Sequence, residues 1–292
     1  MDYKFDDIIG NSNGAGKYNG KLPIIIVVIV SILCGLIVFF VSYAFFGPKK
    51  VKEEPKVDTQ VEITDENVQI LYRYVSYDYN DESKFLKEKQ TSFDSFSNKD
   101  KFYYALQFAT KNDFLDMNKK ENNLEVYSLS NLKVKGYMKR FFGENAVFAD
   151  ETEFTHIFDF ENKKQQAKFK YKESDEGYEV TFEDLKENQE KLVKPYYRQL
   201  TSATKKADGS LIVNEKVIYT LVEETNKVYK VNIYKDYEHS NLIETRQNLS
   251  EEDLKTNPVT MDKYIDKATT ISYTFKLNSD NTYYFASSEI NS

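Results

Sequence analysis

The chain has 292 residues, a formal net charge of −7, and acidic and basic side chains interspersed along its length. This balance argues against sequence-independent binding of nucleic acid, which needs a concentrated basic surface. The single cysteine, Cys34, excludes an intrachain disulfide and a cysteine-ligated zinc site, so a stable fold depends on its own core. With 23 Tyr, 21 Phe and no Trp, that core is expected to be aromatic.

An apolar run dominates the N-terminal part of the chain. Residues 24–46 are uncharged over about 23 positions, enough for a helix to cross a hydrocarbon core of about 30 Å. This pattern predicts a transmembrane helix at residues 23–46 that contacts the lipid bilayer through residues 24–46, after a disordered cytoplasmic tail at residues 1–22. An uncleaved signal anchor is favoured over a signal peptide that is removed. Ser31 and Gly35, four positions apart, form a candidate packing site for a second membrane helix.

The orientation of this segment is not decided by the positive-inside rule, because lysines flank it in nearly equal numbers. Long domains are translocated largely regardless of charge, and the tail ahead of the run is short. The sequence therefore predicts a cell-membrane protein with a cytoplasmic N-terminus and an extracytoplasmic C-terminal domain. Residues 47–62 contain two prolines and dense charge, which predicts a stalk linker.

Residues 63–145 are predicted to form a helical segment, because apolar residues recur at helical spacing between capping signals. The predicted helices are residues 65–75 behind a Thr64 cap, residues 99–109, and residues 131–142 between a Ser130 or Asn131 cap and Gly143. In the third helix the predicted apolar residues are Leu132, Val134, Met138 and Phe141 or Phe142.

Residues 146–292 have an apolar period of two, which predicts strands with one solvated face. Two longer strands, residues 195–207 and 210–224, meet at Asp208-Gly209, a strong hairpin signal. If that loop has two residues, the predicted core side of the hairpin comprises Tyr196, Leu200, Leu211, Val213, Val217, Tyr219 and Leu221.

Further along the chain, a strand is predicted at residues 227–235, a short helix near residues 250–255, and a terminal hairpin at residues 270–277 and 282–287. Successive hairpins without long crossovers indicate antiparallel pairing. The predicted fold class is therefore α+β: one N-terminal transmembrane helix, then a helical segment, then a mainly antiparallel β-sheet domain.

Few residues in the sequence point to chemistry. The chain has two histidines, and His156 lies in a predicted strand among aromatic residues, where we expect it to be packed and hydrogen-bonded to a neighbour. Asp236, Glu238 and His239 form a weak candidate for a loop that binds a cation or a sugar, with a solvated turn as the alternative interpretation. No catalytic, cofactor-binding or metal-binding residue is assigned, and no cofactor is expected.

These features predict a single-pass, membrane-anchored, extracytoplasmic module of a bacterial cell envelope that binds or has a structural role and is not an enzyme. Expected partners are envelope proteins or wall polymers, and not nucleic acid. One alternative is a carboxylate-dependent envelope hydrolase, because two acids brought together by folding leave no fixed spacing in a sequence. The other is a membrane-tethered accessory to an envelope or secretion assembly.

Overall fold

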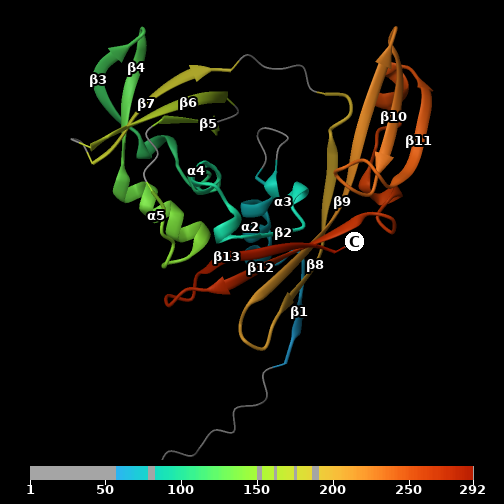
Figure 1. Cartoon of the computed structure of the whole chain (residues 1–292), viewed down its shortest axis with the longest axis horizontal. Helices are drawn as coiled ribbons and strands as arrows, with labels where there is room; N and C mark the ends of the chain where they lie inside the picture. The colour runs from blue at the N-terminus through green and yellow to red at the C-terminus, as the bar shows by residue number, and fades with distance from the viewer. Residues whose placement is uncertain are drawn as a thin grey trace, which may run out of the picture. The chain divides into compact units, whose positions relative to one another are not determined.

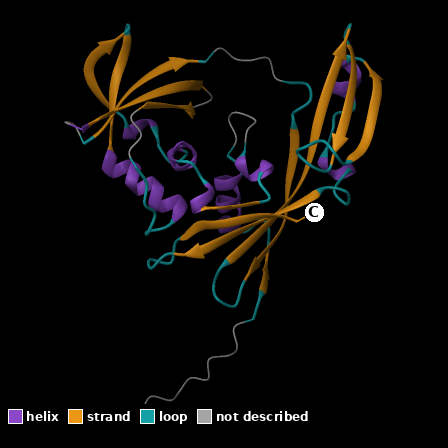
Figure 2. Cartoon of the chain, viewed as in Figure 1, coloured by secondary structure: helices purple, strands orange, loops and turns teal. Residues whose placement is uncertain are grey.

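Antiparallel β-sheet dominates the part of the chain that the computed structural model describes (Figures 1 and 2). The described residues are 57–77, 83–149, 153–160, 163–173, 176–185 and 191–291. Their strands form two separate sheets, and all of these residues fall within one compact unit.

The larger sheet, called sheet A, has eight strands. In spatial order its main path is β1 (Thr59–Val61), β8 (Tyr196–Lys205), β9 (Leu211–Thr225), β12 (Thr269–Leu277), β13 (Tyr283–Asn291) and β2 (Gln90–Ser92). The far half of β9 pairs instead with β10 (Val228–Tyr234), which pairs with β11 (Leu242–Leu249). Figure 1 shows β9 running out of the main path into this three-stranded arm. A single long strand thus connects the two halves of sheet A.

The β8–β9 hairpin turns through a loop of three residues, 207–209, and not two, because Lys206 N donates a hydrogen bond to the Ser210 carbonyl oxygen. The extra loop residue would move every predicted core residue of β8 to the other face. A β-bulge between Leu200 and Ser202 reverses this shift. The predicted core side is therefore confirmed for the part of the hairpin that lies in the main sheet.

In the arm, the predicted core side of the β8–β9 hairpin is wrong. Leu221, predicted to be in the core, is 42% exposed, because β8 ends opposite Tyr219 and Leu221 lies beyond it. The β9–β10 turn has Asn226 and Lys227 at φ angles of +53° and +64°, the left-handed conformation that a two-residue hairpin turn requires.

The second sheet, called sheet B, is antiparallel and has five strands. In spatial order they are β3 (Leu115–Glu121), β4 (Leu124–Ser130), β7 (Gly177–Asp184), β6 (Lys163–Lys172) and β5 (Glu153–Phe160). One face carries the predicted aromatic alternation, with Phe154, Phe158 and Phe169 all buried. The other face is charged, and Lys168 and Lys170 on it form ion pairs with Glu153 of the neighbouring strand β5 and with Glu121 at the end of β3.

The α-helices in the described residues are α2 (Glu66–Val75), α3 (Lys84–Lys87), α4 (Asn98–Leu106), α5 (Asn131–Phe142) and α6 (Glu251–Thr256). Asp65, and not Thr64, caps α2, since its carboxylate accepts from two backbone N–H groups. The predicted bounds of α5 are confirmed, with Ser130 as N-cap and Gly143 ending the helix at a φ of +93°. Leu132 is the exception on its predicted apolar face, being 80% exposed.

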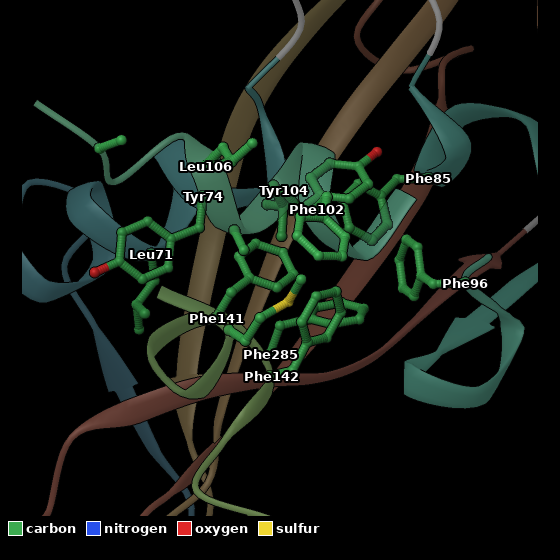
Figure 3. Close-up of a cluster of buried hydrophobic side chains, with 14 of the residues drawn as sticks. Leu71, Tyr74, Phe85, Phe96, Phe102, Tyr104, Leu106, Phe141, Phe142 and Phe285 are labelled. Carbon is green, nitrogen blue, oxygen red and sulfur yellow. The ribbon is translucent and has the colours of Figure 1, made fainter. Parts of the chain in front are cut away.

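Aromatic side chains from the helices join both sheets in the main core. Figure 3 shows the part of this core in which Phe141 and Phe142 lie beside Phe285 of sheet A. The Phe85 ring lies 5.1 Å from the Phe285 ring of sheet A, measured between centroids. Phe102 lies 4.8 Å from the Phe154 ring of sheet B. Each fully buried phenylalanine contributes roughly 1.5–3 kcal/mol of transfer free energy.

A second, smaller core lies under the arm. There Ile218, Val231 and Ile233 pack against the segment that carries α6 and the 3₁₀-helix η4 (Met261–Lys263). The remaining buried members of this core are Val193, Leu254, Val259, Met261, Tyr264 and Ala268.

The fold class predicted from the sequence has to be corrected. The segment at residues 63–145 contains β2, β3 and β4 as well as helices, and residues 146–292 contribute to two sheets. The observed fold is therefore mostly antiparallel sheet with a few short helices, whereas the sequence predicted a helical segment followed by a single sheet domain. The strands β2, β3, β4 and β11 were not predicted. At the end of the predicted stalk, Thr59–Val61 pairs with β8.

The predicted membrane anchor is also not supported. Across the described parts of residues 57–291, the structure contains no helix with the length and apolar character needed to cross a membrane. The predicted tail at residues 1–22, the helix at residues 23–46, and Ser31 and Gly35 within it lie outside the described residues.

Candidate functional site

The candidate site is a depression at one end of sheet B, called the sheet-B hollow, with a cavity volume of about 520 Å³. Its lining combines aromatic side chains with lysines, and consists of Lys111, Phe114, Lys120, Asn123, Leu124, Glu125, Tyr127, Phe160, Lys163, Gln165 and Phe182. The volume lies in the range of ordinary ligand sites.

The floor of the hollow comes from the aromatic alternation of the strands. Phe160 is the last residue of β5, Phe182 lies near the end of β7, and Tyr127 lies in β4. All three side chains are half-buried. Phe182 is at the centre, because the rings of Phe114, Tyr127 and Phe160 lie 5.1, 5.5 and 6.1 Å from it between centroids. The aromatic face of the sheet is therefore open to a ligand here.

One side of the hollow is held by the 3₁₀-helix η2 (Lys111–Asp113), which places Lys111 and then Phe114 at its edge. Asp113 accepts hydrogen bonds from the backbone N–H and hydroxyl of Thr110 and forms an ion pair with Lys133 of α5 at 2.5 Å. Burial acts to raise the pKa of Asp113, but the hydrogen bonds from Lys133 and Thr110 outweigh it and lower this pKa to about 2. The turn is thus fixed by charge-assisted hydrogen bonds.

The rim of the hollow carries an excess of positive charge. Lys163 pairs with Asp184 at 2.8 Å, but Lys111 and Lys120 are exposed and form no ion pair with any residue that the structure describes. Glu125, the acidic residue in the lining, accepts a hydrogen bond of 3.0 Å from the Tyr127 hydroxyl, which raises the pKa of that hydroxyl. Two lysines are therefore available to an anionic ligand.

The loop predicted as a ligand candidate lies in the arm, between β10 and β11. The Asp236 carboxylate accepts hydrogen bonds from the backbone N–H groups of Ser240 and Asn241 and from the Ser240 hydroxyl. Glu238 is exposed, and the His239 ring lies 4.8 Å from the Tyr234 ring between centroids. Asp236 thus stabilises its own turn.

His156, expected to be packed, is buried in β5 and confirms that prediction. Its Nε2 forms a hydrogen bond of 3.0 Å with the Tyr77 hydroxyl, and the ring lies 4.5 Å from that of Phe158. Burial lowers the pKa of His156 to about 3. It is neutral at physiological pH and far from solvent. In the described residues, groups of three or more His, Cys, Asp or Glu side chains that could hold a metal ion are absent.

A buried charge network in sheet A was not predicted. Glu215 of β9 is fully buried, and the Arg198 guanidinium of β8 donates to it through Nε and Nη2, each at 2.7 Å. The hydroxyls of Tyr72 and Tyr273 also donate to the Glu215 carboxylate, at 2.8 and 2.5 Å. Burial, followed by the charge of Glu215, raises the pKa of both tyrosines, which stay protonated donors. The network joins α2 to the sheet.

A second hollow of about 800 Å³ lies between α2, α5 and the β12–β13 turn. Its polar groups bond to one another: Arg140 Nε donates to the Tyr74 hydroxyl at 3.2 Å, and Asp280 accepts from the backbone N–H and hydroxyl of Thr282. The Arg140 guanidinium also lies 4.3 Å from the centre of the Phe108 ring. The sheet-B hollow is the better candidate because Lys111 and Lys120, two lysines without an ion pair among the described residues, lie together beside its aromatic floor.

The hollow could not be located from the sequence, because its members come from separate segments. The strands β3 and β4, which were not predicted from the sequence, supply Lys120, Leu124 and Tyr127. The sequence did contain a signal for these strands. Apolar Leu124 and Val126 alternate with Glu125 directly after Asn122-Asn123, and both asparagines adopt positive φ angles in the turn.

Comparisons with known protein families, with curated proteins and with solved structures find no match to this chain.

Proposed function

We propose that the described part of the chain is a binding module of the cell envelope, not an enzyme, and that it takes an anionic ligand in the sheet-B hollow. One observation carries the proposal: Lys111 and Lys120 are exposed beside an aromatic floor and form no ion pair with a described residue. Elsewhere on sheet B, cross-strand acidic partners neutralise Lys168 and Lys170. In a chain of net charge −7, this local positive rim would favour an anion over the rest of the surface.

An extracytoplasmic position is the second part of the proposal. It rests on the sequence alone, in which an uncharged apolar run of the kind found in export signals precedes the described residues, and it includes no membrane anchor. The test is protease treatment of intact cells that carry a C-terminal tag on the chain, with lysed cells as the control. Removal of the tag from intact cells supports the proposed position, and protection until lysis contradicts it.

The proposed site is tested by binding of polyanions to the purified full-length chain at low ionic strength. The probes are polyglutamate, polygalacturonate and polyphosphate, with neutral dextran for comparison. At least one polyanion should bind more tightly than dextran. Because an exposed charge pair contributes about 0.2–1 kcal/mol, replacing both Lys111 and Lys120 by Gln should weaken that binding severalfold.

The matched control replaces Lys135 and Lys164 by Gln. These lysines are also exposed, form no ion pair with a described residue and do not line the hollow. The control removes the same net charge and should bind as the wild type does. Equal losses in the two variants would mean that the whole surface, and not the hollow, attracts the polyanion. Binding of dextran as tight as that of every polyanion would also overturn the proposed function.

A further inference from the structure

We infer that the ligand of the sheet-B hollow is an acidic peptide segment of a partner protein, with one aromatic side chain inserted as an anchor. The inference rests on the proposed function, because it names the ligand class for the same hollow. Three features of the site carry it: the angles between its rings, its volume and the kind of charge on its rim.

The floor forms a corner and not a flat platform. The ring planes of Phe114, Tyr127 and Phe160 make angles of 84°, 73° and 66° with that of Phe182. A chain of sugar rings stacks best on ring faces laid along its length, whereas these rings present a mixture of faces and edges. Edges and faces meeting at steep angles are the arrangement in which a further aromatic ring packs well. The corner therefore favours a single inserted side chain.

The volume agrees with such an anchor. About 520 Å³ is enough for a large aromatic side chain together with part of the backbone on either side. Aromatic anchors in pockets at the centre of a contact, surrounded by charged residues at its rim, are the usual source of affinity between proteins. A half-buried floor with exposed lysines around it has this organisation.

The lysines on the rim favour acidic residues on either side of the aromatic anchor in the peptide. Lys111 comes from η2 and Lys120 from the end of β3, so the two charges come from separate elements of the hollow. Each lysine is a compact charge on a flexible stem, which can reach a carboxylate in several positions. Asp or Glu residues next to the anchor would pair with them. The Asn123 amide group and the Gln165 amide oxygen face the peptide backbone, since Gln165 Nε2 already donates to Asp184 at 2.7 Å.

The test uses the absence of tryptophan from the chain. The indole of a peptide Glu-Asp-Trp-Glu-Asp is then the single indole in the mixture, so its fluorescence anisotropy reports binding to the full-length chain directly. A neutral peptide Gln-Asn-Trp-Gln-Asn and the anchorless peptide Glu-Asp-Ala-Glu-Asp serve as comparisons, the latter as a competitor. The acidic tryptophan peptide should bind best, and loss of the anchor should weaken binding about thirtyfold.

Variants locate the peptide. Replacing Lys111 and Lys120 by Gln should weaken the acidic peptide severalfold and bring its affinity close to that of the neutral peptide. Phe160→Ala should weaken both tryptophan peptides, and it alters a half-buried residue at the end of a strand, so the fold should survive. Circular dichroism checks this. The Lys135→Gln, Lys164→Gln double variant should bind as the wild type does.

The outcomes separate this inference from the proposed function. If polygalacturonate or polyphosphate binds through Lys111 and Lys120 and the acidic peptide does not, the ligand is not a peptide and the inference is overturned, while the proposed function stands. If the neutral tryptophan peptide binds as well as the acidic one, the inference is likewise overturned. If no polyanion and no peptide responds to the two lysines, both proposals fall.

Discussion

Glu215 and Arg198 form the most deeply buried ion pair among the described residues, with side-chain exposures of 0% and 11%. Removing one partner of such a pair leaves the other charge buried without compensation. Glu215→Leu should therefore lower the free energy of unfolding by roughly 3–5 kcal/mol, measured by urea denaturation. Adding Arg198→Met should recover part of the loss, because the guanidinium is then no longer unpaired. A cost below about 1 kcal/mol for the single variant would contradict this account.

The control for this prediction is the pair Lys255–Glu251 on α6. Its distance is 2.6 Å, but both side chains are 54% exposed. Water screens such a pair and replaces its interactions when one partner is lost. Glu251→Gln should therefore leave the denaturation midpoint where it is in the wild type. A loss as large as that of Glu215→Leu would show that burial is not what distinguishes the two pairs.

His156 should make the stability of the fold depend on pH. Its pKa is lowered from 6.5 to about 3 by burial, so the unfolded chain takes up a proton between these values and the folded chain does not. The stability associated with the neutral ring is therefore full above pH 6.5 and is lost as the pH falls toward 3. Between pH 7 and pH 4 this loss is on the order of 3 kcal/mol.

Urea denaturation of the wild type and of His156→Gln at several pH values measures this effect. The difference between their pH slopes isolates His156 from the carboxylates, which titrate in both proteins. His239→Gln is the matched control, because it removes the other histidine from a surface loop of the arm. Parallel slopes for the wild type and His156→Gln would mean that the buried ring accepts a proton without loss of structure.

At the level of the elements, α5 has one glycine within it and one at its C-terminal cap, and the two have opposite requirements. Gly136 lies inside the helix, where an added Cβ would meet no atom within 4 Å. Gly143 ends the helix at a φ of +93°, and an added Cβ would lie 2.8 Å from the Tyr284 ring. Gly136→Ala should thus stabilise the protein by about 0.5–1 kcal/mol. Gly143→Ala should destabilise it by roughly 1–3 kcal/mol.

Urea or thermal denaturation of these two variants compares the same chemical change at two positions of one helix. Since each adds a single methyl group, the general effect of alanine cancels in the comparison. Changes of the same sign would contradict the account, because they would show that helix propensity does not decide the outcome at Gly136 or that the left-handed turn does not decide it at Gly143.

The helices and strands that were predicted correctly are those whose bounds depend on residues close by in the sequence. The bounds of α5 were predicted correctly because Ser130 and Gly143 act on their own neighbours. The strands β3 and β11 were missed because edge strands with few buried residues show little alternation. The β8–β9 loop differed by one residue, and the compensating bulge depends on cross-strand packing. For the site, local pattern could indicate the aromatic face but not the lysines that folding brings beside it.

For the whole molecule, the arrangement of the core decides which parts can fold alone. A helical pattern gives way to a strand pattern near residues 143–150, and the sequence alone does not show whether the two segments form one core or two. The main core crosses this point, since Phe102 of α4 lies 4.8 Å from Phe154 and 5.8 Å from Tyr178 between ring centroids. The separate core is the smaller cluster under the arm.

A fragment of residues 146–292 should therefore not fold by itself. It would lack β3 and β4, which are two of the five strands of sheet B, and the helices that bury the aromatic faces of both sheets. Exposing so many phenylalanine and tyrosine side chains costs far more than the few kcal/mol by which domains are stable. Circular dichroism and thermal denaturation should show a cooperative transition for residues 57–292 and none for the fragment. A cooperative transition in the fragment would mean that sheet A with its arm is stable without the helices, and that the aromatic contacts across the boundary join two folding units that are already formed.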